Sequence, residues 1–465
     1  MQLYHDGNHG YIADAGTGNL RLRSGTLEIQ NLAGSKTSAV FSSGGGQTLN
    51  FNDSPKFVTT NTGAVVTGIC TATSFSGSGE GLTRTTQLSH RNIIINGAML
   101  VAQRGTSSTS AGYQTVDRFS QGFANTNENP TMQQTTVAVP SSPYNLPTSG
   151  DHPYKEGFRK TFYVQNGNQT TAAGANQDMS TSYFIEGQDL VGSGWDYTDP
   201  NSYLTISFWV KTTAAQTYYV GFRLYGPSNG NQREYCFNFT PAQFTWTKVT
   251  HSIPGHASNT LREDNAMGAF IQFIQYWGTN YTSSGRTNEA WQAKNNNSNY
   301  PDVAGNWYNT NDASYQITGL QLEVGQQATP FEHRKFGDEL NACKRYFARH
   351  GWDSQNGVQK VRIIPGINEH ASNYGLYVNF GFDVEMRAQP TVTFGSNVTV
   401  GRPQVAVGRR INSTSTGLNS PSGIGFMKWP TSGTYGGQLG SHGDAYYYVK
   451  IGNDSDAYID CSAEL

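Results

Sequence analysis

The sequence YLTISFWVKT, residues 203–212, decides the fold class because its apolar residues recur at every second position. Alternation of this kind puts one set of side chains on each face of a strand. The two sets are Leu204, Ile206, Phe208 and Val210 on one face, and Tyr203, Thr205, Trp209 and Lys211 on the other. A strand with one strongly apolar face has to bury that face against a second layer, so the stretch indicates a sheet packed face to face with another sheet.

Further strand-like stretches surround this one, separated by Gly, Asn and Pro turns. They are NIIINGAM at 92–99, TVDRFSQGF at 115–123, MQQTTVAVP at 132–140, TYYVGFRLYG at 217–226, REYCFNFT at 233–240, FTWTKVTHSI at 244–253, GAFIQFIQYW at 268–277 and YQITGLQLEVG at 315–325. Strands at such short spacing predict a β-sandwich of the jelly-roll kind over residues 92–332, with 317–324 as its last strand.

One helix is predicted in a chain that is otherwise all-β. Residues 334–347 carry Phe336, Leu340, Cys343 and Phe347, spaced so that they share one face of a helix. We therefore expect a linking helix within 333–350, followed by a smaller β domain over 351–465. The apolar stripe of the helix needs a partner, which would be the base of the next domain or equivalent helices in other copies.

Residues 1–83 predict a different architecture, a run of very short strands that end at Gly, Asn-Asp or Asp-Ser turns. The apolar content of each strand is too small to offset a backbone ordering cost of about 1–2 kcal/mol per residue. Alternating residues such as Leu20, Leu22, Leu27 and Ile29 would instead be covered by other copies of the chain. We expect a shaft of three chains around one axis, joined to the sandwich by a Gly/Ser-rich linker that includes 84–91.

Composition narrows the functional classes. Hydrophobic residues make up 36% and charged residues 14% of the 465 positions, against about 25% charged in typical globular proteins. The net charge of −2 disfavours nucleic-acid binding, and no apolar run approaches the roughly twenty residues of a membrane span. The start of the chain lacks the pattern of an export signal. The four cysteines lie far apart, so we expect unpaired thiols packed as small apolar groups.

Several stretches together resemble tail-fibre and related virion proteins of bacteriophages, particularly phages of marine and cyanobacterial hosts. The stretch GLQLEVGQQATPFEHRKFGDELNACKRYF at 319–347 is the most specific. The others are NIIINGAMLVAQRG at 92–105, FDVEMRAQPTVT at 382–393, the terminal SAEL at 462–465, and the shaft-like LYHDGNHGYIADAGTGNLRL at 3–22, SPKFVTTNTGAVVTG at 54–68 and TATSFSGSGEGLT at 71–83.

This resemblance implies a virion fibre subunit that is homotrimeric, needs no cofactor and contacts other tail or baseplate proteins. Its sandwich would resemble carbohydrate-binding modules and bind a host-surface glycan through several copies at once. The alternative is a purely structural virion protein, such as a head fibre, baseplate spike or connector. Because Met1 lies within a shaft-like repeat, a distal fibre subunit held by another protein is also expected.

Sugar binding needs flat aromatic faces beside short polar side chains. The segment 276–308 offers the most such residues, scattered among Asn, Ser, Thr and Gly in what we expect to be loops. The candidates are Trp277, Tyr281, Trp291, Tyr300, Trp307 and Tyr308, with Trp209 on the outer face of its strand as a seventh. The alternative is that these rings fill the ends of the sandwich, and that a cover lies over Trp209.

Metal and catalytic sites have weaker signals. Asp189, Asp196 and Asp199 could bind calcium, although their spacing fits no EF-hand loop. His5 and His9 have a zinc-like spacing, but a turn separates them. The carboxylate pairs or clusters of a polysaccharide-degrading enzyme would have to come from Glu263–Asp264 or Glu332–His333, and no GxSxG, HExxH or phosphate-binding loop occurs. We therefore expect no metal and no enzymatic activity.

Overall fold

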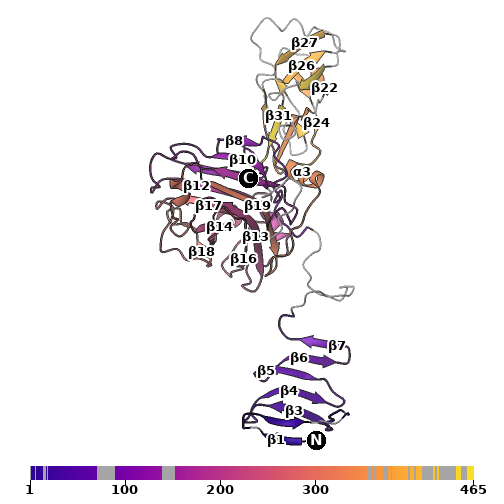
Figure 1. The fold of residues 1–465 in the computed structure, drawn as a ribbon. Coiled ribbons are helices and arrows are strands. Elements are labelled where there is room, and N and C mark those ends of the chain that lie inside the picture. Colours follow the sequence, from indigo (N-terminus) through magenta and orange to yellow (C-terminus); the bar gives the residue numbers. More distant parts are fainter. Residues whose placement is uncertain are drawn as a thin grey trace. The chain divides into compact units, whose positions relative to one another are not determined.

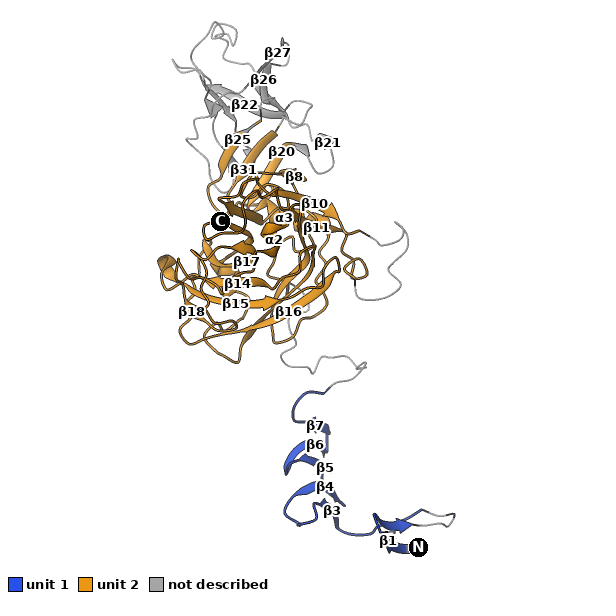
Figure 2. Cartoon of the chain, turned by 60° about the vertical axis from the view of Figure 1, so that its left-hand side comes forward, with its two compact units in different colours: residues 1–84 blue, residues 85–465 orange. Residues whose placement is uncertain are grey.

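The computed structural model describes residues 2–5, 7–13, 17, 19–70, 90–138, 152–353, 382–395 and 458–465, together with the backbone of the strands between 358 and 451. The chain divides into two compact units, residues 1–84 and 85–465 (Figure 2). Nearly all of the described elements are strands in antiparallel sheets, which confirms the all-β fold class. The expected linker at 84–91 falls mostly outside the described residues, as does the stretch 71–83.

The first unit consists of short strands joined by tight turns (Figure 1). A two-stranded sheet comes first, with β1 (Gln2–His5) and β2 (Gly10–Ala13). A five-stranded meander follows, with β3 (Thr26–Gln30), β4 (Thr37–Ser42), β5 (Thr48–Phe51), β6 (Ser54–Thr60) and β7 (Gly63–Val66). Asn52 and Asp53 form the β5–β6 turn with positive φ, a conformation that these side chains tolerate better than most. Residues 19–24, where we expected a strand, are irregular.

Two six-stranded sheets form the sandwich in the second unit. The first sheet has the order β16 (Thr247–Pro254), β13 (Tyr203–Thr212), β19 (Ser314–Val324), β11 (Lys160–Gln165), β10 (Thr131–Thr136) and β8 (Ser107–Ser108). The second sheet has the order β18 (Gln292–Ala293), β15 (Arg233–Phe239), β14 (Tyr218–Leu224), β17 (Met267–Trp277), β12 (Asp178–Glu186) and β9 (Phe119–Ala124).

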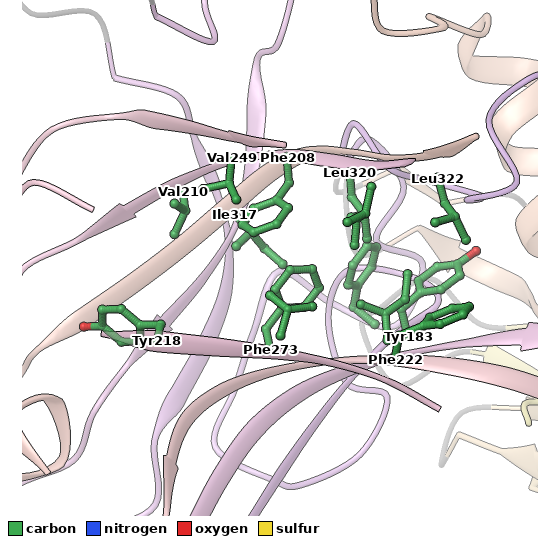
Figure 3. Close-up of a cluster of buried hydrophobic side chains, with 14 of the residues drawn as sticks. Tyr183, Phe208, Val210, Tyr218, Phe222, Val249, Phe273, Ile317, Leu320 and Leu322 are labelled. Atoms are coloured by element: carbon green, nitrogen blue, oxygen red, sulfur yellow. The ribbon is translucent and has the colours of Figure 1, made fainter. Parts of the chain in front are cut away.

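The core lies between these two sheets, and alternation along the strands supplies it. Figure 3 shows Phe208 and Val210 of β13 with Ile317 and Leu320 of β19, facing Phe273 on the opposite sheet. Phe208 meets Phe273 edge to face, with 5.0 Å between the ring centroids. Interdigitation of this kind stabilises a sandwich through the apolar area that it removes from water.

The strand predicted at 92–99 is wrong: the stretch is buried, as expected, but it is not a strand. Asn96 and Met99 adopt positive φ, and the Asn96 amide donates to the carbonyls of Val101 and Asp117. The Asn92 carboxamide oxygen accepts hydrogen bonds from the backbone N–H groups of Ile94 and Leu322. Side-chain amides thus replace the ladder that a strand would provide, which apolar periodicity alone does not reveal.

Helices are few among the described residues and mostly short. They are α1 (Gly187–Val191), the 3₁₀ helix η1 (Pro227–Asn229), α2 (Asn306–Asn309) and α3 (Phe336–Lys344). The helix predicted within 333–350 is α3, but its buried side is not the expected stripe: Cys343 is buried with Glu339, whereas Phe336 is exposed. The Glu339 carboxylate accepts from the N–H of Asn96, so α3 packs on its own chain through a polar contact.

Two further sheets and a two-stranded ribbon follow α3. One sheet has the order β21 (Val358–Gln359), β20 (Phe347–Asp353), β31 (Tyr458–Ser462) and β25 (Thr391–Phe394). The next has the order β27 (Val405–Arg410), β26 (Val398–Arg402), β30 (Tyr447–Ile451), β22 (Ile363–Glu369), β23 (Gly375–Val378) and β29 (Met427–Lys428). The ribbon pairs β24 (Phe380–Gly381) with β28 (Gly423–Ile424).

The C-terminal residues close onto the sandwich through buried charges. The Glu464 carboxylate lies 2.6 Å from Nη1 of Arg118, a side chain that is 1% exposed, and 3.1 Å from Nη2 of Arg104. The Tyr113 hydroxyl donates to the carbonyl of Leu465. These contacts tie the residues after β31 to the sandwich, while β31 itself pairs with β20 in the four-stranded sheet.

Candidate functional site

Trp209 lies on the outer face of the first sheet, as predicted, but a cover encloses it. Its ring packs with Phe158 and Trp246 and is 1% exposed. The indole N–H donates to the Glu156 carboxylate at 3.0 Å, and the Lys248 ammonium lies 5.7 Å from the ring centroid. No ring face is left for a sugar, so the cover that the sequence allowed is the arrangement that the structure has.

Four of the six aromatic candidates in 276–308 are also buried. Trp307 and Tyr308, on α2, belong to the main core. Trp291 packs against the same core and donates from its indole N–H to the Pro254 carbonyl at 2.7 Å. Tyr300 is fully buried on the outer side of the second sheet. These four rings hold the sandwich together, as the alternative interpretation proposed, and they offer no stacking face.

Tyr300 belongs to a segment, residues 278–303, that covers half of the outer face of the second sheet. Its ring lies directly over Gly221 of β14, where an added Cβ would come within 2.3 Å of the hydroxyl oxygen. Only glycine therefore lets the segment lie flat on the strand. The Tyr300 hydroxyl donates to the Gln272 side chain on the neighbouring strand.

Buried charges hold this covering segment in place. The Glu234 carboxylate on β15 accepts from Nε of Arg223, on the sheet, at 2.6 Å, and from Nη2 of Arg286, in the segment, at 2.8 Å. Arg223 also donates to the Asn299 side chain. Burial raises the pKa of Glu234, while the two arginines oppose that shift. The cover is thus fixed by charge-assisted bonds together with the short ladder that pairs β18 with β15.

The other half of the outer face, over β17, β12 and β9, carries short side chains. Register places Ser182 between Ser120 and Gln272, and Ser180 between Gly122 and Ile274. Because directly opposed residues in antiparallel strands share a face, these residues form two neighbouring rows. Gln272 donates to the Ser180 hydroxyl at 2.9 Å. Ser180, Ser182, Gln272 and Ile274 are buried, so only the β9 members of these rows, Ser120 and Gly122, are partly exposed.

A partly exposed aromatic corner adjoins these rows. We call Asp178, Trp277, Tyr281, Asn176 and Asn280 the Asp178 corner. Asp178 opens β12 and pairs directly with Trp277 at the end of β17, so the carboxylate and the indole share the outer face. Trp277 meets Tyr281 edge to face at 5.8 Å. Tyr281 donates to the Asn176 carbonyl, and the Asn280 amide donates to the Asn176 side chain. Trp277 and Tyr281 are the two predicted aromatics that the structure brings together with part of each ring exposed.

Two polar groups in the Asp178 corner lack partners among the described residues. The Trp277 indole N–H is buried with no acceptor. The Asp178 carboxylate is half-buried with no hydrogen-bond donor or cation in the described part of the chain, and burial raises its pKa to about 6. Buried polar groups are nearly always paired, so the Asp178 carboxylate, which is partly exposed and has no donor, points to an external polar ligand.

Sequence reasoning missed Asp178, although one signal was present. An Asp at the start of β12, DMSTSYFIE, is unusual for a half-buried position because the seven residues after it are uncharged. Two of the other acidic candidates are engaged by the fold. Asp196 caps its own turn by accepting from Thr198 and Asp199, and Glu332 accepts from the N–H groups of His90 and Asn92. Among the described residues, no three His, Cys, Asp or Glu side chains are grouped as a metal site would require.

The cysteine side chains are mostly buried. All four cysteines are unpaired, and Cys236, Cys343 and Cys461 are buried as expected, whereas Cys70 is exposed. Burial raises the pKa of Cys236 to about 12, so this thiol stays protonated. Cys70 lies in the first unit, which has almost no interior to receive it.

In the part of the chain that is described, no helix is long and apolar enough to span a membrane.

The first unit carries a second candidate surface. Ile29, Ala39, Leu49, Phe57 and Val66 are opposed in turn across β3 to β7, so they form one row along a single face, which we call the apolar row. Ala39 is buried, and the other four are 37–51% exposed. Strands lie about 4.8 Å apart, so the row runs for about 19 Å. Ala39 is the one buried apolar residue among the described residues of this unit.

Comparisons with known proteins find similarity in structure alone. No family model and no curated protein matches the chain. Among solved structures, the enzymatically active domain of tailspike protein 4 of bacteriophage CBA120 is 10% identical, with 50% of this chain and 22% of that chain covered, at a TM-score of 0.27. The chain therefore spans about a fifth of that tailspike domain.

Carbohydrate-binding modules are also similar. The family 11 module of a cellulosomal cellulase of Clostridium thermocellum is 13% identical, covering 48% of this chain and 98% of the module, at a TM-score of 0.24. A family 30 module is 10% identical, covering 54% and 95%, at a TM-score of 0.24. All of these TM-scores lie below 0.5, a level at which similarity supports no functional conclusion.

Proposed function

We propose that the chain is a subunit of a phage virion fibre, a tail fibre, which attaches the virion to a host-surface polysaccharide through several weak, non-covalent contacts. The observation that carries this proposal is the apolar row of the first unit. A sheet that exposes a continuous apolar face in water gains stability only when another surface covers it. Copies of the same chain bring an identical row, and closed symmetry lets each row meet its equivalents.

Three copies suit the geometry of the row. Apolar residues on one face of narrow, stacked strands can meet around a common axis, while the opposite face carries the mixed row Glu28, Val40, Thr48, Val58 and Val65. The homotrimer then carries three sandwiches on one shaft. Because each sandwich is tethered to the others, a glycan contact too weak to hold alone becomes effective when several form on one surface. Other tail or baseplate proteins complete the attachment to the particle.

The glycan contact is assigned to the Asp178 corner. Trp277 and Tyr281 supply ring faces, and the Asp178 carboxylate accepts hydroxyl hydrogen bonds. The partly exposed Ser120 and Gly122 of β9 continue this face beside β12.

Light scattering and glycan binding test the proposal together. The intact chain is expected to have the mass of a trimer and to bind at least one member of an array of bacterial surface polysaccharides. Trp277→Ala should abolish that binding, whereas Phe244→Ala, which removes an exposed aromatic ring outside the corner, should leave it unchanged. A stable monomer would contradict the fibre, and binding that survives Trp277→Ala would contradict the site.

A second candidate function is a purely structural virion protein, such as a head fibre, baseplate spike or connector. The observation that favours it is that five of the seven aromatic candidates are buried and support the fold. A trimer that binds no surface polysaccharide, and no bacterial cells when labelled with a fluorophore, would favour this role over attachment.

A further inference from the structure

The Asp178 carboxylate is isolated in a way that restricts its ligand. β9 and β17, which flank β12, contain no Lys, Arg, His, Asp or Glu, and neither do residues 174–177 and 278–281, which border the corner. The titratable groups nearby are the hydroxyl of Tyr281, which donates to the Asn176 carbonyl, and that of Tyr276, which donates to Gly174. Among the described residues, Asp178 therefore has neither a cation to neutralise it nor a second carboxylate to share a proton.

Two other carboxylates of the sandwich are engaged by hydrogen bonds within the fold. Glu128 accepts from the N–H of Asn168 at 2.6 Å, and Asp302 accepts from the Thr282 hydroxyl at 2.8 Å. Asp178 thus differs from these two carboxylates because its own oxygens are not used by the fold. The charge of Asp178 is partly desolvated and does not stabilise the fold. Replacing Asp178 by a neutral residue would therefore not lower the stability of the protein.

We infer that Asp178 makes the corner selective for neutral glycans, because its carboxylate accepts hydrogen bonds from their vicinal hydroxyls. The same carboxylate excludes glycans that carry carboxylate or phosphate groups. This inference rests on the proposed function and names the substrate class of that site. A carboxylate accepts two adjacent hydroxyl donors with its two oxygens, and such charge-assisted bonds are stronger than neutral ones. A uronic acid placed on Trp277 would instead bring a like charge to a site that has no cation.

Protonation of Asp178 removes its charge without a substitution, so a change of pH can test the role of that charge. Burial raises the pKa of Asp178 to about 6, so the group changes its charge in a range where the protein can be assayed. Above this pKa the ionised carboxylate accepts two hydroxyls. Below it one oxygen becomes a donor, so a neutral glycan binds more weakly, while an anionic glycan no longer meets a like charge.

Matched pentasaccharides test the inference by calorimetry with the intact chain. The probes are a neutral glucan, a fully carboxylated uronan and a glucosamine oligomer, each measured at pH 7.5 and pH 5. The wild type is expected to bind the neutral probe at least about tenfold more tightly than the uronan at pH 7.5. This margin should shrink at pH 5, and Asp178→Asn should show the small margin at both pH values. Asp338→Asn, a change at an exposed position on α3, is the matched control and should behave as the wild type.

Each outcome separates this inference from the proposed function. If no probe or array polysaccharide binds, the proposed function fails and the inference fails with it. If the wild type binds, Trp277→Ala does not, and Asp178→Asn ranks the probes as the wild type does, the function stands and the inference is refuted. Preference for the glucosamine oligomer would also refute it, because Asp178 would then serve as the counter-ion of an ammonium group.

Discussion

The apolar row of the first unit allows a quantitative prediction for self-association. Leu49 is 48% exposed in a single chain, and burying a whole Leu side chain contributes about 2 kcal/mol. Covering the exposed half therefore contributes about 1 kcal/mol per copy. In a trimer, Leu49→Ser removes that contribution three times, about 3 kcal/mol in all. The association constant should fall by about two orders of magnitude.

Sedimentation equilibrium of the intact chain measures this change directly. Leu32→Ser is the matched control, because Leu32 is fully exposed in the β3–β4 turn and lies outside the apolar row. It makes the same chemical change and should leave the association constant unaltered. Equal association of Leu49→Ser and the wild type, or an ordered first unit in a wild-type chain that stays monomeric, would refute the reasoning.

Three further predictions concern the second unit. Glu234→Gln should lower the free energy of unfolding by about 3 kcal/mol, because Arg223 and Arg286 lose their counter-charge. The midpoint of urea unfolding measures this loss. An unchanged midpoint would show that the covering segment does not depend on these ion pairs. Glu464→Gln should also lower the free energy of unfolding by about 3 kcal/mol, because the buried Arg118 loses its counter-charge. Proteolysis after β31 should then be faster than in the wild type, because the C-terminal residues are no longer held on the sandwich. Burial raises the pKa of Asp117 to about 6, from an unfolded value of 3.8. The protonated carboxyl therefore stabilises the fold below pH 4. As the pH rises toward 6, the free energy of unfolding should fall by up to about 3 kcal/mol. Asp117→Asn should flatten that part of the pH profile, and an unaltered slope would contradict it.

The sandwich strands were predictable because apolar alternation is a local property. The β13 strand covers the same ten residues as the alternating stretch 203–212, and β14, β15 and β17 fall within their predicted ranges or differ from them by one residue. Sheet order was not predictable, because pairing depends on contacts between distant residues. β19 is the last sandwich strand in the sequence, yet it lies at the centre of its sheet between β13 and β11.

The aromatic candidates show why the site was harder to predict than the fold. An aromatic ring in a polar loop has the same sequence signature whether it faces solvent or folds back onto a sheet. Tyr300 is buried because residue 221, far away in the sequence, is glycine and leaves room for it. Trp277 remains partly exposed because it ends β17, where the cover begins. Burial of this kind is decided by tertiary packing, which no local pattern contains.

The two candidate surfaces depend on each other, and this dependence distinguishes a fibre from a simple binding domain. A corner with two partly exposed rings and one carboxylate offers few contacts, so its affinity for a single oligosaccharide is expected to be low. Tethering three corners raises the affinity for a repeating polysaccharide without adding any contact. Leu49→Ser, which acts only on the first unit, should therefore weaken binding to an immobilised polysaccharide by a hundredfold or so, while binding to the matching soluble oligosaccharide stays as in the wild type. Equal weakening of both would mean that the substitution damages the sandwich, and unchanged binding to the surface would mean that a single corner is sufficient.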